Sequence, residues 1–412
     1  MLLVAALAPL VVLATTVVAD PNAIPNSPIS ISLPITKQIN LTGTFHPSQR
    51  DQNRWMNLLT GGQASTSEIT EVPLTYSIIA YSANIGVGDP PTYYSLTVDT
   101  GSANTWVGAN KPYSKTKTSV KTDDFLNVPY GTASVNGTEY EETVTIAPGV
   151  AIRQSIGVAS NSFGIYPFDG ILGIGPKYLT LDTLFPDNTS IIPTVTDNLY
   201  GQGKIEQNLV AVSFEPTASE PVIDGELTFG STDSTKYTGD ITYFPITKTL
   251  PSGRFWGVDA SFIYGNAQGK KAPVTILDTT AGVIDTGTNQ IGLGTDAYNR
   301  YVDATGAVYD ENTGLLRITP AQYENLQSLF FGIGGRTYEL NANAQIWPRT
   351  LGVPGGEKDS IYLVVFDLGS IISLDLGFIA GQPFLERYYS VFDTGNSRVG
   401  FATTPFTYAD IN

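Results

Sequence analysis

A five-residue motif occurs twice in the chain, once at Val98 to Ser102 and again at Ile284 to Thr288. In each copy an apolar residue leads into Asp-Thr-Gly and then into a hydroxyl residue. This pattern predicts a buried strand followed by a tight turn, in which glycine adopts a backbone shape that a β-carbon would hinder. Because the copies lie about one domain length apart, two similar halves could each offer one carboxylate to a shared cleft.

Each half also contains a later apolar segment that ends in glycine. Ile171-Leu172-Gly173 follows the first motif, and Phe378 to Gly381 follows the second. The same two features in the same order indicate an internal duplication at the scale of a domain. Helices are expected at residues 191–203, 295–304 and 320–329.

Composition favours a mainly β fold and limits the partners. The 412 residues suffice for two to three domains, and Thr, Ser, Val, Ile and Tyr recur in short runs between frequent Gly and Pro. With 22 basic and 38 acidic residues the net charge is −16, which argues against nucleic acid or an anionic membrane surface. This acidity supports solubility, and it also suits an acidic medium, where such a chain does not become strongly cationic.

The residue inventory excludes several hydrolase classes. The chain has no cysteine, so it has no disulfide framework, thiol nucleophile or cysteine-based zinc site. Its one histidine, His46, lies before the expected folded region. A Ser-His-Asp hydrolase and a His-ligated zinc hydrolase are therefore nearly excluded, and no metal or cofactor is expected.

The N-terminal part is expected to be removed during maturation. Residues 1–19 are apolar, are interrupted by Pro9 and end in small residues, which is typical of a secretory signal; a membrane anchor is the alternative. Residues 20–64 resemble a pro-segment, followed by a first lobe at 65–216 and a second at 217–412. The protein is therefore expected to be secreted.

The pro-segment is basic where the rest of the chain is acidic. Lys37, His46, Arg50 and Arg54 all lie within it. It could cover an acidic cleft until acid protonates the carboxylates and weakens the attraction, although an ordinary disordered leader would have a similar composition.

Taken together, these features resemble the pepsin-like aspartic proteases, and the resemblance extends from about Ser65 to the end of the chain. Within that family the likeness is to cysteine-free members from basidiomycete fungi. The motifs that carry it are VDTGSANTWVG, VPYGTASVNG, FDGILGIG, GELTFGSTDSTKYTGDITYFPI, AGVIDTGT and FLERYYSVFDTGNSRVGFA.

The resemblance implies a bilobal fold of two homologous β-barrel-like lobes with an active-site cleft between them. By motif match, Asp99 and Asp285 would be the catalytic pair. Their turns would be supported by Thr100, Gly101, Ser102, Thr286, Gly287 and Thr288, and a flap over the cleft would include Tyr130, Gly131 and Thr132, with Trp106 beside it.

The chemistry of paired acids follows from the residues themselves. Two carboxylates in one site cannot both ionise cheaply, so they share one proton and titrate as one system. The ionised partner can take a proton from a bridging water while the protonated one hydrogen-bonds the scissile carbonyl. The expected activity is acidic endoproteolysis of extended protein or peptide segments by a monomer with no stable membrane association.

Other interpretations of these acids are weaker. Asp393 also precedes Thr-Gly, but Asn396 replaces the hydroxyl residue, and Asp278 lacks the turn glycine, so both are expected to be structural. A catalytically silent binding protein of the same fold is the main alternative, and a carboxylate-pair glycosidase is a more distant one. Three possible glycosylation sites occur at Asn40, Asn136 and Asn188.

Overall fold

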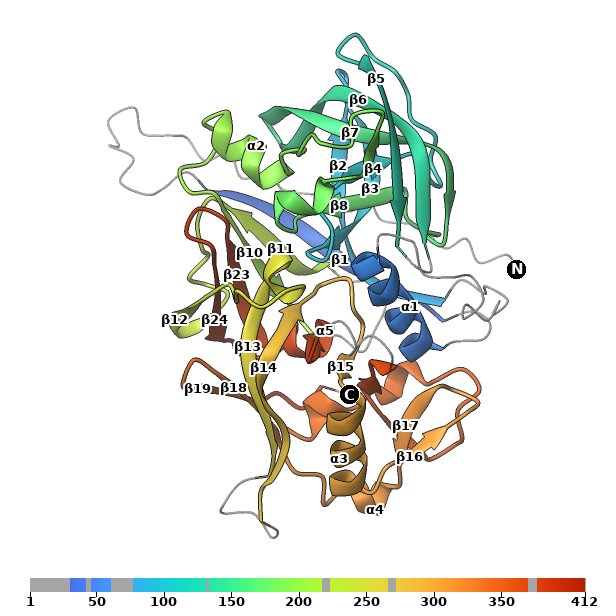
Figure 1. The fold of residues 1–412 in the computed structure, drawn as a ribbon, viewed down its shortest axis with the longest axis vertical. Coiled ribbons are helices and arrows are strands. Elements are labelled where there is room, and N and C mark those ends of the chain that lie inside the picture. The colour runs from blue at the N-terminus through green and yellow to red at the C-terminus, as the bar shows by residue number, and fades with distance from the viewer. Residues whose placement is uncertain are drawn as a thin grey trace, which may run out of the picture.

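The computed structural model describes residues 30–41, 46–60, 77–130, 133–216, 223–265, 272–369 and 376–411. Figure 1 shows the first half of the chain, in teal and green, at one end of the molecule and the second half, in yellow and orange, at the other, with helix α1 (Pro47–Thr60) between them. The fold is mainly β, as predicted.

One long sheet runs through both halves. In spatial order it contains β12 (Thr238–Pro245), β24 (Arg398–Thr403), β23 (Tyr388–Asp393), β10 (Leu209–Phe214), β11 (Ile223–Phe229), β1 (Ile31–Leu41), β2 (Ser77–Val87), β3 (Thr92–Asp99), β8 (Gly170–Gly173), β4 (Thr105–Val107), β7 (Val150–Phe163), β6 (Ser134–Ala147), β5 (Val120–Pro129) and β9 (Leu184–Phe185). The expected lobe boundary at residues 216 and 217 therefore falls between β10 and β11, which pair with each other in this sheet.

Two smaller sheets lie in the second half, and short helices lie in both halves. One sheet has the order β19 (Arg336–Leu340), β18 (Leu329–Ile333), β13 (Gly257–Tyr264), β14 (Val274–Ile284), β22 (Phe378–Ala380), β15 (Ile291–Leu293) and β21 (Val365–Asp367). The other comprises β16 (Val308–Asp310), β17 (Leu315–Ile318) and β20 (Ile361–Leu363). The remaining helices are α2 (Val195–Gly201), α3 (Thr295–Thr305), α4 (Pro320–Tyr323) and α5 (Gln382–Leu385), with single 3₁₀ turns at Lys177–Thr180, Ser252–Arg254, Asn343–Gln345 and Arg349–Leu351.

The pairing around the two motifs is duplicated. In the first half, β3 pairs in parallel with β8, which pairs antiparallel with β4. In the second half, β14 pairs in parallel with β22, which pairs antiparallel with β15. The repeated apolar segments that end in glycine are β8 and β22, so the internal duplication inferred from the sequence is confirmed in the strand topology.

The helices agree with the sequence in two places and differ in a third. Helices α2 and α3 lie where they were predicted, and Thr194 caps α2 by accepting a hydrogen bond from the Asp197 amide. Helix α4 ends at Tyr323, whereas a helix to residue 329 was expected. The apolar residues that follow alternate inward as strand β18, and a short apolar run of this kind does not distinguish helix from strand.

The folded region begins well before the expected first strand. Strand β1 lies between β11 and β2, with Ile31, Leu33 and Ile35 buried at alternate positions. This alternation is present in the sequence, but the many polar residues around it obscure it. Among the described residues, no helix is both long and apolar enough to span a membrane.

Candidate active site

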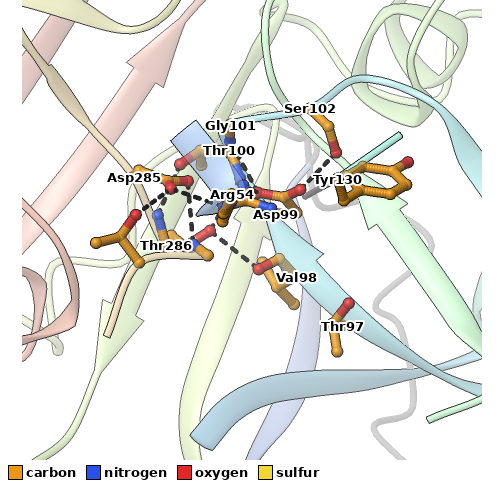
Figure 2. A network of polar contacts seen from close by, with 12 residues as sticks. Arg54, Thr97, Val98, Asp99, Thr100, Gly101, Ser102, Tyr130, Asp285 and Thr286 are labelled. Carbon is orange, nitrogen blue, oxygen red and sulfur yellow. Dashed lines mark hydrogen bonds and ion pairs between the residues drawn. The ribbon is translucent and has the colours of Figure 1, made fainter. Parts of the chain in front are cut away.

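The two Asp-Thr-Gly motifs meet where the halves face each other. Strand β3 ends at Asp99, and β14 ends one residue before Asp285. Both aspartates are buried, with 2% and 0% of their surface exposed. Figure 2 shows the two aspartates on either side of Arg54, with Thr100 and Thr286 close to them. The structure thus brings together the acids that the repeated motif singled out.

The threonines bind each turn to the opposite half. The Thr286 hydroxyl accepts a hydrogen bond from the Thr100 amide at 2.9 Å and donates to the Val98 carbonyl at 3.0 Å. Reciprocally, the Thr100 hydroxyl accepts from the Thr286 amide at 2.9 Å and donates to the Ile284 carbonyl at 3.3 Å. Because these groups are buried, losing either hydroxyl would leave a backbone donor and acceptor without partners.

Each carboxylate is held by its own turn in the same way. The Gly101 amide donates to Asp99 Oδ1 at 2.9 Å, and the Ser102 hydroxyl donates to Oδ2 at 2.5 Å. The second copy repeats the pattern: Asp285 Oδ1 accepts from the Gly287 amide at 3.0 Å and Oδ2 accepts from the Thr288 hydroxyl at 2.6 Å. The two carboxylates are therefore fixed in matching orientations.

The turn glycines allow the two acids to approach each other. A β-carbon on Gly101 would lie 2.7 Å from Asp285 Oδ1, and one on Gly287 would lie 2.7 Å from Asp99 Oδ1. Neither position has room for a side chain, because both neighbours are anchored carboxylates. Burial raises the pKa of Asp99 above its usual value, and Asp285 adds to the rise.

The expected flap residue lies close to the pair. Tyr130 is buried, and its hydroxyl accepts a hydrogen bond from Trp106 Nε1 at 3.1 Å. A cavity beside the acids is lined by Asp99 and Tyr130 from the first half and by Thr286 and Gly287 from the second. The other expected flap residues, Gly131 and Thr132, lie outside the described residues.

Arg54 of helix α1 lies directly on the two aspartates. Its Nη2 atom is 2.6 Å from Asp99 Oδ1, and its Nε atom is 3.4 Å from Asp285 Oδ2. Burial by itself lowers the pKa of Arg54, but the two carboxylates outweigh it and hold that pKa above its ordinary value. A charged guanidinium thus occupies the space between the acids, as Figure 2 shows.

A tryptophan one residue further on fixes the helix against the second half. Trp55 is fully buried, and its Nε1 atom donates to the Thr288 hydroxyl at 2.8 Å. Its ring packs in an apolar cluster whose other buried members are Phe255, Val283, Phe366, Leu368, Leu376 and Ile379. The sequence did not reveal this contact, because a single tryptophan in a polar stretch does not indicate its tertiary partner.

The other basic residues of the leading segment have separate partners. Lys37 Nζ lies 2.6 Å from Glu386 Oε1, and Arg50 donates to the Asn289 side-chain oxygen at 2.8 Å. His46 lies in a different cavity, beside Gly314. The four basic residues therefore have separate surroundings, and of these four only Arg54 forms ion pairs with Asp99 and Asp285.

The sequence did not single out Asp51, an acid on helix α1 that contacts the second half of the chain. Its side chain is fully buried, and it accepts a hydrogen bond from the Asn289 amide at 3.0 Å. Arg50 lies 3.4 Å away. Burial raises the pKa of Asp51 to about 7, although Arg50 and the Asn289 amide oppose the rise. No motif marks this residue, since its acidity matters only once the helix is docked.

Asp51 is expected to make docking of α1 weaker as the pH rises. In solvent its pKa would be about 3.9, so between that value and about 7 the docked helix binds more protons than the free one. In the wild type, residues 47–60 should be less protected from amide hydrogen exchange at pH 8 than at pH 6. We expect Asp51→Asn to reduce this difference, because the variant should be more protected than the wild type at pH 8. Exchange would be corrected for its intrinsic pH dependence, and an unchanged difference would contradict this role.

The third Asp-Thr-Gly triplet is placed elsewhere. Asp393 ends strand β23, and its Oδ2 atom accepts hydrogen bonds from Arg398 Nε at 2.7 Å and from Asn396 Nδ2 at 2.8 Å. Asp278 is exposed on β14. Among the described residues, no group of three or more His, Cys, Asp or Glu side chains is arranged to hold a metal ion.

Known proteins share this arrangement. A sequence profile of the eukaryotic aspartyl protease family matches residues 80–404. Polyporopepsin from Irpex lacteus is 56% identical over 342 residues, covering 83% of this chain and 99% of that protein. Gastricsin from Cavia porcellus is 29% identical over 395 residues, covering 90% and 92% of the two chains. The crystal structure of an aspartic proteinase from Irpex lacteus superposes with a TM-score of 0.79 and 51% identity, over 93% of this chain and all of that one. The chain therefore belongs to the eukaryotic aspartyl protease family and is a pepsin-like aspartic endopeptidase.

Proposed function

We propose that Asp99 and Asp285 are the catalytic pair of a secreted acid endopeptidase that is made as a zymogen. The observation that carries the proposal is the matched pair of buried carboxylates with Arg54 between them, in a helix that precedes the family-matched region. The charged guanidinium occupies the place where a substrate carbonyl and a water molecule would have to bind. The chain with α1 docked is thus expected to be inactive.

Once α1 has left, the pair can activate water. One aspartate is ionised and takes a proton from a water molecule, and the oxygen of that water attacks the scissile carbonyl carbon. The other aspartate is protonated and gives its proton to the carbonyl oxygen, so the product of attack is a neutral tetrahedral diol. Transfer of a proton to the amide nitrogen then lets the C–N bond break, which yields a carboxylic acid and an amine.

The cavity next to the two aspartates supports the proposal that the substrate is an extended peptide. It is lined by residues of both halves, including Tyr130, which directly follows strand β5. An extended peptide can bind in such a cleft through its main chain, with its side chains in pockets on either side. Closure of the flap would exclude water and align the bond. Folded segments would not fit, so flexible protein regions are the proposed substrates.

Acid is proposed to release the helix. Arg54 faces both carboxylates, and the attraction is strong because all three groups are buried. Lowering the pH protonates the pair and leaves the guanidinium with less opposing charge. Residues 1–19 would be removed on secretion and residues 20–64 on activation, and the mature enzyme would act as a monomer without stable membrane association.

The full chain can test this function directly. We expect the full chain to leave denatured casein intact at pH 7. After transfer to about pH 4, we expect the chain to lose its own N-terminal segment and then to digest casein. N-terminal sequencing of the shortened chain should place the new start between residues 56 and 72. An acid-treated chain that is shortened but digests nothing would favour the silent binding protein, and a start far outside this range would contradict the proposed boundary.

A further inference from the structure

An exposed apolar patch lies at the far edge of the long sheet. Phe125 on β5 and Phe185 on β9 are direct cross-strand partners, with 56% and 69% of their surface exposed. Strand β9 is the last strand of the sheet. Tyr178, Leu181 and Ile191, in the segments on either side of β9, are also exposed. Apolar side chains gathered at a sheet edge favour aggregation unless something covers them.

The asparagine of a glycosylation triplet lies in the loop that carries this patch. Asn188 is exposed and is three residues beyond Phe185. Its amide donates to the Pro186 carbonyl at 3.1 Å, and its carbonyl accepts from the Asp182 amide at 3.2 Å. The neighbouring Asp187 amide donates to Asp124 Oδ1 at 3.0 Å, next to Phe125. These bonds fix the Asn188 backbone in the loop that directly follows Phe185.

The other two triplets have different surroundings. Asn136 is exposed in the middle of the β5–β6–β7 ladder, and its direct cross-strand partners are the polar residues Asn127 and Asn161. Asn40 is in β1, within the segment proposed to be removed on activation. Asn188 follows Phe185 by three residues in one loop, whereas Asn136 lies opposite Asn127, two residues from Phe125 along β5.

We propose that Asn188 carries an N-linked glycan whose first sugars cover the Phe125 and Phe185 rings. The inference rests on the proposed passage through the secretory pathway. The apolar C–H face of an N-acetylglucosamine ring stacks on an aromatic ring, while its hydroxyls stay in water. The glycan would thus hide the patch and keep the sheet edge from pairing with another chain.

The donor for this modification is a lipid-pyrophosphate-linked oligosaccharide. A bond forms between Asn188 Nδ2 and C1 of the first sugar, and the bond between C1 and the pyrophosphate oxygen breaks. Nδ2 loses one proton, and the lipid pyrophosphate leaves with the electron pair. Ser190 supplies the hydroxyl that the triplet requires. The glycan is transferred to the unfolded chain. Because Asn188 is exposed, the chain can fold with the glycan attached.

The full chain, secreted from a eukaryotic host, provides the test. We expect a glycan on the Asn188 peptide by mass spectrometry, and we expect Asn188→Gln to lose one oligosaccharide from the intact mass. Binding of a dye specific for exposed apolar surface should rise in Asn188→Gln and should fall again when Phe125→Ser and Phe185→Ser are added. Asn136→Gln is the comparison variant, because it removes the other triplet of this sheet; a rise in dye binding in Asn136→Gln and none in Asn188→Gln would overturn the covering role of Asn188.

The outcomes separate this inference from the proposed function. An unmodified Asn188 in a secreted and active protease would overturn the inference and leave the protease function intact. A glycan at Asn188 whose loss does not raise dye binding would overturn the covering role. A chain that retains residues 1–19 and is not exported would instead contradict secretion. Circular dichroism would verify that each variant is folded, as expected for exposed side chains.

Discussion

Replacing Asp99 or Asp285 by asparagine is expected to lower kcat/KM for casein at pH 4 by about 10²- to 10⁴-fold, the usual contribution of a general acid or base. An amide can neither take the proton from water nor give one to the carbonyl oxygen. The substitution keeps the size of the side chain, so the turn and its glycine contacts can remain. Casein peptides would be quantified after each chain has been shortened in trans by immobilised wild-type enzyme that is then removed.

The exposed Asp278 offers a control of the same chemistry. Asp278→Asn should retain wild-type activity, because Asp278 lies within β14, seven residues before Asp285, and its side chain is exposed. Thermal unfolding of all variants would show whether the buried substitutions keep the fold. Full activity in Asp99→Asn or in Asp285→Asn would refute the assignment of the pair, and it would direct attention to other acids.

Replacing Arg54 by glutamine is expected to accelerate conversion of the full chain to active protease at pH 6 by about 10- to 10³-fold. Removing one partner of a buried ion pair costs about 3–5 kcal/mol, although proton sharing by the two aspartates offsets part of that cost here. The docked helix loses its charge complement, so it leaves the acids at a higher pH. Conversion would be followed by chain length and casein digestion after transfer from pH 8.

Two further variants show whether charge or geometry matters. Arg54→Lys keeps the charge but lacks the planar fork that reaches both carboxylates, so an intermediate rate is expected. Arg153→Gln removes an exposed arginine whose partner, Glu141, is also exposed, and it should convert at the wild-type rate. An Arg54→Gln chain that stays latent at pH 6 would mean that the apolar anchor at Trp55 holds the helix without the ion pair.

The sequence was sufficient for the acids because their geometry is local. Asp-Thr-Gly-Ser and Asp-Thr-Gly-Thr encode the turn, the hydrogen bonds to each carboxylate and the space for the opposite acid within a few residues. The same local logic separated Asp393 from the pair, since Asn396 provides a different partner. The repeated apolar segments also predicted the internal duplication, which the pairing of β8 and β22 with the motif strands displays.

The rest depended on contacts between distant parts of the chain. Charge contrast suggested that the pro-segment could cover an acidic cleft, but helix α1 presents Asp51, Arg54 and Trp55 on one face only once it is folded. The path of the long sheet was also hidden, because β1 finds its neighbours in β2 and β11, far apart in sequence. Nothing in a single sequence ranks such pairings.

The reciprocal bonds of Thr100 and Thr286 give the site the symmetry of a two-fold dimer, in which each partner offers the other the same groups that it receives. In the chain described here that symmetry is broken by Arg54, which approaches Asp99 and Asp285 through different nitrogen atoms and at different distances. The proposed release of the helix would remove this source of asymmetry between the two acids. A peptide has a direction, however, and so the substrate itself assigns the proton by the way it lies across the pair.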